Sequence, residues 1–270
     1  MNLRAVRAIV RKDLSVVRQS NAVLLPLIIV PAVMLVLLPL LASFAPQFVN
    51  IPGASDLGAL LERMPEAFTR RFAGLSEEQT IVTLLLVYLF APMYLIVPLM
   101  VASVIAADAF AGEKERRTLE ALLFTPTTDR ELLLGKLLSG FVPALAVAWA
   151  GFLVYVVVAN AAAWPVMGRV FFPTAMWWVL ALWVAPAVAA VGLGATVLVS
   201  ARVNTFQEAY QIGGVVVLPI IVLLLGQVTG VLVFSAALVA LLGAVFWAVA
   251  AALLVFGARG FRRGDVLSRT

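Results

Sequence analysis

The sequence predicts an all-α membrane protein with six transmembrane helices, and three observations support this fold class. Hydrophobic residues make up 64% of the chain and charged residues only 12%, whereas a soluble domain is about half apolar and about a quarter charged. The apolar residues fall in runs of roughly twenty or more, which is the length that crosses a ~30 Å hydrocarbon core. The basic residues gather at the ends of these runs, so the net charge of +5 reflects membrane topology and not nucleic-acid binding.

Residues 2–18 are expected to form an amphipathic helix that lies at the membrane surface. Apolar residues recur there at helical spacing, and basic residues occupy another face. Such a helix rests among the lipid head groups instead of crossing the bilayer. The alternative is a signal peptide with a cleavage site at 43–45, but its basic region is too long and the apolar run that follows can span a membrane. The basic residues of the predicted interfacial helix are Arg4, Arg7, Arg11, Lys12 and Arg18.

The whole chain, residues 1–270, is predicted to be one transmembrane domain. The first span contains three prolines and should be kinked, which membrane helices tolerate when neighbouring groups satisfy the freed carbonyls. Residues 45–79 form the outer loop, and Ser76 to Gln79 resembles a capping box that opens the second span. The six spans are predicted at about 21–44, 80–106, 137–160, 174–200, 209–228 and 231–257.

The distribution of lysine and arginine predicts the orientation of the spans. With six spans, fifteen of these residues lie on the side that holds both termini and the loop 108–136, and four lie on the other side. Basic residues are retained in the cytoplasm. We therefore expect a multi-pass membrane protein with both termini and this loop in the cytoplasm.

The loop 108–136 is a dense polar segment between two apolar helices. Residues 113–124 have helical propensity, with Gly112 before them and Pro126 after them. Thr128 to Glu131 then forms a capping box for a second helix, which continues through Gly135 and Lys136 into the third span. Composition alone is equally consistent with an ordinary solvated loop. The helix–turn–helix pattern favours a docking surface, because a simple connection needs no second helix.

The loop resembles the signature segment of ABC transporter type-2 permeases, in which Glu-[Lys/Arg]-Glu-x-[Gly/Arg]-Thr-Leu-Glu-x-Leu-Leu-x-[Ser/Thr]-Pro is followed by Glu-x-x-x-Gly-Lys. The resemblance implies a cytoplasmic coupling helix that sits in a groove of a separate ATPase subunit, and two six-span units that pair to form the pathway. It also implies that ATP and Mg²⁺ bind the partner chain and that this chain binds no cofactor. The residues expected to contact the ATPase subunit are Glu113, Lys114, Glu115, Arg116, Arg117, Thr118, Leu119, Glu120, Leu122, Leu123 and Pro126.

The lengths of the connections indicate a branch of that family. The connection between the fifth and sixth spans is minimal, and the main outer segment lies between the first and second. This layout is similar to the sodium-efflux and multidrug-efflux permeases. The resemblance implies a multi-pass protein of a bacterial inner (plasma) membrane. The apolar spans instead suit a lipid, a peptide or a hydrophobic drug as the substrate, so the sequence leaves the substrate class open.

Several kinds of chemistry are missing from the sequence. The chain has no cysteine and no histidine, and Gly135-Lys136 is followed by Leu137, so it does not form a P-loop. The predicted spans contain no acidic or basic residue, which disfavours an ion-coupled carrier. We predict a non-enzymatic permease subunit of an ATP-driven exporter. Two alternatives remain: a stand-alone secondary transporter or channel, and a non-transporting membrane scaffold driven by an ATPase.

Overall fold

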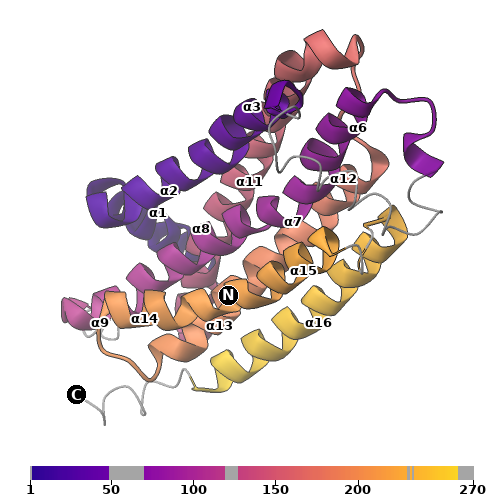
Figure 1. Cartoon of the computed structure of the whole chain (residues 1–270). Helices are drawn as coiled ribbons and strands as arrows, with labels where there is room; N and C mark the ends of the chain where they lie inside the picture. Colours follow the sequence, from indigo (N-terminus) through magenta and orange to yellow (C-terminus); the bar gives the residue numbers. More distant parts are fainter. Residues whose placement is uncertain (1, 49–69, 119–126, 230–231, 233, 261–270) are drawn as a thin grey trace.

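The computed structural model describes residues 2–48, 70–118, 127–229, 232 and 234–260. It confirms the all-α polytopic class, because six helices within these ranges are long and apolar enough to cross a membrane. Figure 1 shows them running side by side as a bundle. The six helices cover Asn21–Gln47, Glu77–Glu115, Asp129–Met167, Ala175–Ser200, Phe206–Val228 and Ala236–Gly257. The second and third extend beyond the predicted spans, toward the loop that joins them.

Each span except the third and sixth is built from several consecutive helical segments. A separate helix, α1 (Leu3–Gln19), precedes the first span. The first span comprises α2 (Asn21–Ala32), η1 (Val33–Leu37), α3 (Leu38–Ser43) and η2 (Ala45–Phe48). After the short η3 (Arg70–Phe72), the second comprises α6 (Glu77–Thr83), η4 (Leu84–Leu89), α7 (Phe90–Tyr94), α8 (Ile96–Ala107), η5 (Asp108–Gly112) and α9 (Glu113–Glu115).

The remaining four spans follow in the same way. The third is the single helix α11 (Asp129–Met167), and the sixth is α16 (Ala236–Gly260). The fourth comprises α12 (Ala175–Val179), η6 (Leu180–Val184) and α13 (Ala185–Ser200). The fifth comprises α14 (Phe206–Gly213), η7 (Gly214–Val217) and α15 (Leu218–Val228).

Prolines explain three of the π-helical segments. Proline has no N–H, so it leaves the carbonyl four residues earlier without its helical partner. Pro39, Pro92 and Pro186 each follow such a segment, and the carbonyls that they free lie inside η1, η4 and η6. A local π register lets the helix continue past the missing hydrogen bond.

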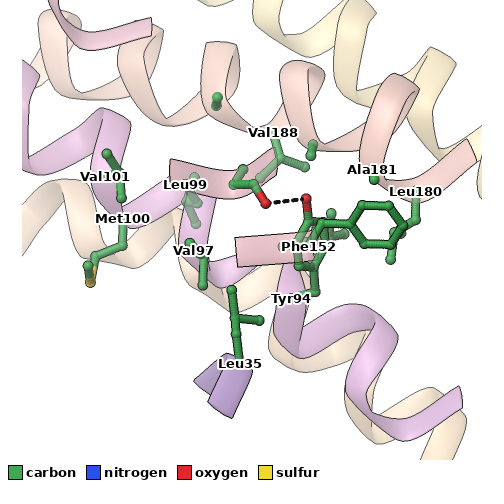
Figure 2. Packing of buried hydrophobic residues seen from close by; sticks show 14 of the residues in the cluster. Leu35, Tyr94, Val97, Leu99, Met100, Val101, Phe152, Leu180, Ala181 and Val188 are labelled. Carbon is green, nitrogen blue, oxygen red and sulfur yellow. Dashed lines mark hydrogen bonds between the residues drawn. The ribbon is translucent and has the colours of Figure 1, made fainter. Parts of the chain in front are cut away.

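The second and fourth spans form the centre of the bundle. Their apolar windows are 67% and 78% buried, against 17–22% for the other four spans. The two helices approach closely at Gly192, where an added Cβ would lie 2.9 Å from the carbonyl oxygen of Leu99. Aromatic rings fill the space beside them, and Figure 2 shows Tyr94 next to Phe152, with ring centroids 6.3 Å apart.

The two ends of the bundle are distinguished by the elements that they carry. One end carries α1, α9, the first turns of α11 and the turn between α13 and α14, and we call it the basic end. Figure 1 shows α1, α9 and α14 together at this end, and α3 and α6 toward the other. Ser76 caps α6 at the opposite end through the predicted capping box, which is confirmed.

Candidate functional site

Helix α1 packs along the start of α11 at the basic end. Asn2 caps the helix, and its backbone N–H also donates to Glu131 Oε1 at 2.5 Å. Ile9 faces Gly135, where an added Cβ would lie 2.8 Å from Ile9 Cγ2 and 2.9 Å from Ile9 Cβ. Only glycine permits this approach, because Ile9 Cβ cannot move without its backbone. The predicted amphipathic helix is therefore present, and its apolar face lies against the bundle.

The basic residues of α1 divide into two groups. Four arginines are exposed, and Lys12 is only half-buried and turns toward the bundle. The exposed residues are Arg4, Arg7, Arg11 and Arg18.

Beneath α1, four charged side chains meet in a buried group that we call the ion cluster: Lys12, Asp13, Glu113 and Lys136, with Ser139 beside them. Lys136 Nζ lies 2.5 Å from Glu113 Oε2, and it also donates to the backbone oxygen of Ala109. Lys12 contacts the other Glu113 oxygen, and its Nζ lies 2.9 Å from Asp13 Oδ1. Ser139 Oγ donates to Asp13 Oδ2 at 3.0 Å.

The ion cluster is electrically balanced and connects three helices. Its two ammonium groups offset its two carboxylates, which is the condition under which charges can be buried at acceptable cost. The Lys136 side chain is fully buried and that of Glu113 is 5% exposed. Helix α1 contributes Lys12 and Asp13, α9 contributes Glu113 and α11 contributes Lys136, so separating any of these helices from the others breaks at least one ion pair.

The protonation state of Lys12 follows from its partners. Burial lowers the pKa of the Lys12 ammonium, but hydrogen bonds to Glu113 and Asp13 and their negative charges raise it more. The net result is a pKa above the ordinary value of 10.5. Lys12 is therefore charged at neutral pH.

A second group of contacts joins α9 to the turn between α13 and α14. Lys114 Nζ donates to the backbone oxygen of Val203 at 3.1 Å. Glu115 Oε2 accepts the N–H of Phe206, the first residue of α14, at 2.9 Å. A carboxylate at this helix N-terminus also interacts favourably with the helix dipole. The end of the second span is thus held to the fourth and fifth spans as well.

The polar loop leaves the bundle through a sharp backbone change. Asp108 is buried and pairs with Arg116, with Oδ1 and Nη1 2.9 Å apart. Arg117 has a φ of 56°, a left-handed conformation that ends the helix. On the other side of the loop, Thr128 and Glu131 form the capping box of α11, which confirms that prediction.

The predicted start of the loop helix is wrong. Gly112 has helical dihedral angles, φ −63° and ψ −38°, so the second span continues through it to Glu115. The sequence pattern placed the start at Glu113, directly after Gly112. In the structure, Glu113 is paired with lysines of α1 and α11. Glu113 to Glu115 therefore end the second span instead of beginning a separate helix.

The structure separates the residues predicted to contact an ATPase. Glu113 is buried in the ion cluster and Lys114 is half-buried, whereas Glu115, Arg116, Arg117 and Thr118 are exposed. The remaining predicted contacts fall outside the described residues. They are Leu119, Glu120, Leu122, Leu123 and Pro126.

Sequence reasoning missed Asp13 and Ser139. Asp13 follows Val6 and Ile9 on one face of α1 and precedes Val17 on the same face, and all four are buried. An acidic residue inside an apolar stripe signals a buried ion pair, because an unpaired charge there would be too costly. No comparable signal exists for Ser139, since serine is common in apolar helices.

The fold and the site define a multi-pass membrane protein whose polar loop is anchored by buried charges. The chain matches the profile of a family described as ABC-2 family transporter protein over residues 7–238. This match covers most of the chain and includes the ion cluster, so the chain belongs to the ABC-2 family. No curated protein and no solved structure matches it. Family membership makes it a membrane transport component and implies association with an ATP-binding cassette subunit.

Proposed function

We propose that this chain is the permease subunit of an ATP-driven exporter, and that a separate ATPase subunit docks at the basic end. Family membership and the six apolar helices support the transport role. The concentration of lysine and arginine at this end supports a cytoplasmic orientation. The ATPase subunit would hold ATP and Mg²⁺.

The observation that carries the proposal is the ion cluster below the polar loop. The exposed residues Arg117 and Thr118 follow directly on α9, whose Glu113 is paired with lysines of α1 and α11. Breaking a buried ion pair costs about 3–5 kcal/mol. A displacement of the loop would therefore move the three helices together instead of deforming the loop alone.

A displacement of the polar loop can be transmitted to the centre of the bundle through the second span. Helix α9 continues without a break from α8, which packs closely on α13 at Gly192. Rigid-body movement of packed helices is a common way to switch a protein between two states. In our proposal, closure of the ATPase subunits on ATP moves α9 and reorients the central helices.

Three further features complete the proposal. The chain pairs with a second copy or a homologue to enclose the pathway, resides in a bacterial inner membrane with both termini in the cytoplasm, and belongs to an efflux branch of the family. The support is the charge distribution for the orientation and the short connection between the last two spans for the branch.

The absence of cysteine from the sequence allows a direct docking test. We would introduce Thr118→Cys at the loop and, as the control, Val170→Cys, which is 70% exposed at the opposite end. Each variant is co-expressed with its ATP-binding cassette subunit and treated with a short bifunctional cross-linker. We expect a cross-linked product from Thr118→Cys alone. Equal products from both positions, or none from Thr118→Cys, would contradict docking at this loop.

A second experiment tests coupling. Glu113→Gln keeps the size of the side chain but removes the charge that both lysines share. We expect the ATPase subunit to remain bound while permease-stimulated ATP turnover falls about ten-fold or more, since the loop no longer holds α1 and α11 together. Unchanged stimulation would refute the coupling role. Transport by the chain alone, without any ATPase, would instead favour a secondary transporter.

A further inference from the structure

A cavity opens at the end of the bundle opposite to the ion cluster. It has a volume of about 380 Å³ and lies among α6, η4 and the segment 167–174. This size falls within the range of small-molecule sites, roughly 300–1,000 Å³. The ATPase docking proposed above does not involve this region, so an assignment for the cavity stands independently.

The cavity is lined by two guanidinium groups. Arg71 is held in place, because its Nη1 lies 3.4 Å from the Tyr88 hydroxyl and donates to the Phe234 backbone oxygen at 3.3 Å. Arg169 is exposed and makes no hydrogen bond or ion pair with another residue that the structure describes. None of the described lining residues is acidic. Both charged side chains among the described lining residues are therefore basic.

Two hydroxyl groups in the cavity wall also lack partners. The Thr83 and Thr174 oxygens are buried and have no hydrogen-bond partner among the described residues. Thr174 stands at the N-cap of α12, yet its side chain makes no capping bond. A buried hydroxyl without a partner is unfavourable. Both side chains line the cavity, so rotation of each hydroxyl toward it would let the hydroxyl donate to a ligand with several acceptor oxygens.

We propose that this cavity binds the phosphate group of an anionic amphiphile. Guanidinium groups bind phosphate oxygens through paired hydrogen bonds, and threonine hydroxyls can donate to the remaining oxygens. The apolar wall at Met167 and Phe171 provides a surface for the hydrocarbon part of the same molecule. The cavity lies where the apolar helices end, which is the depth of lipid head groups for a spanning bundle.

The test uses the purified full chain in detergent and compares three variants with the natural chain. Native mass spectrometry measures the binding of phosphatidylglycerol, with phosphatidylcholine as the zwitterionic comparison, and inorganic phosphate is titrated as a competitor. The variants are Arg169→Gln, the double variant Thr83→Val with Thr174→Val, and the control Arg202→Gln. Arg202 is an exposed arginine at the basic end, so its substitution makes the same change in net charge. Arg71 is left intact because its bond to Phe234 also stabilises the fold.

We expect Arg169→Gln to weaken phosphatidylglycerol binding about ten-fold or more, as the loss of hydrogen bonds to a charged group predicts. The threonine double variant should unfold at the same temperature as the natural chain, or higher, while binding more weakly. If these hydroxyls had only a structural role, the double variant would lose thermal stability and lipid binding together. Arg202→Gln should bind as the natural chain does.

The competitor identifies the source of the phosphate. Displacement of the lipid by inorganic phosphate, sensitive to Arg169→Gln, would support the site and make free phosphate a sufficient ligand. Failure of inorganic phosphate to compete would support the site and assign it to a lipid. Equal loss of binding in Arg169→Gln and Arg202→Gln, or equally tight binding of phosphatidylcholine, would overturn the proposal.

Discussion

Replacement of Lys136 by methionine tests the ion cluster most directly. The Lys136 side chain is fully buried, and its ammonium lies 2.5 Å from Glu113 Oε2. Methionine fills a similar volume without a charge. The variant therefore removes one ion and leaves Glu113 buried with Lys12 as its remaining partner.

The expected cost follows from these contacts. Two unit charges about 4 Å apart interact by about 4 kcal/mol at an effective dielectric constant of about 20. Methionine requires no desolvation and Lys12 continues to pair with Glu113, and both effects reduce this value. We expect Lys136→Met to lower the free energy of unfolding by about 3 kcal/mol, within the range for breaking a buried ion pair. Glu113→Gln should cost a similar amount, because it leaves Lys136 buried with only a backbone oxygen.

The double variant provides the decisive measurement. Lys136→Met combined with Glu113→Gln removes both charges, so it should cost about as much as either single change instead of the sum. Reversible unfolding in mixed micelles gives the four free energies. Lys114→Met serves as the control, since this half-buried lysine donates to one backbone oxygen and should cost about 1 kcal/mol. Additive losses, to within about 0.5 kcal/mol, would refute the pairing.

Two further predictions concern the contact of α1 with the bundle. Gly135→Ala should destabilise the protein by about 1–3 kcal/mol, because the new methyl group displaces α1. The control Gly214→Ala should be neutral or slightly stabilising, because a Cβ added there meets nothing within 4 Å. Equal melting temperatures for the two variants would argue against the close approach of α1. The folded-state pKa of Lys12 is raised, so its stabilisation is fully present below 10.5 and is lost as the pH rises through the folded value. The difference in melting temperature between the natural chain and Lys12→Met should therefore stay constant from neutrality to about pH 9 and shrink only above 10.5; a change near neutrality would contradict this assignment.

The ion cluster gives the positions of the signature loop distinct structural roles. In the pattern Glu-Lys-Glu that begins at Glu113, the first carboxylate is directed inward to two lysines and the second binds the N-terminus of α14. The Gly-Lys pair at the end of the loop also consists of two residues with different roles. Gly135 admits α1, and Lys136 neutralises Glu113. In this chain the two parts of the signature meet in space, and the exposed surface begins at Glu115.

The roles of polar residues near the spans also depend on their contacts in the folded chain. Asn160 is one of these residues and lies at the end of the predicted third span. Its amide nitrogen donates to the backbone oxygens of Val156 and Phe172, and its side-chain oxygen accepts the N–H of Phe171. Asn160 thus holds the connection between the third and fourth spans.

Local features of the sequence were sufficient for the fold class, the amphipathic helix α1 and the capping boxes at Ser76 and Thr128. Each depends on forces that act over a few residues: the length of an apolar run against the bilayer, helical periodicity, and a side chain that caps the nearest free N–H. The buried position of Glu113 could be known only from the tertiary structure. Its partners Lys12 and Lys136 lie 101 and 23 residues away, and pairing at such separations is chosen by helix packing. The second span also continues through Gly112, whereas the sequence pattern began a separate helix at Glu113.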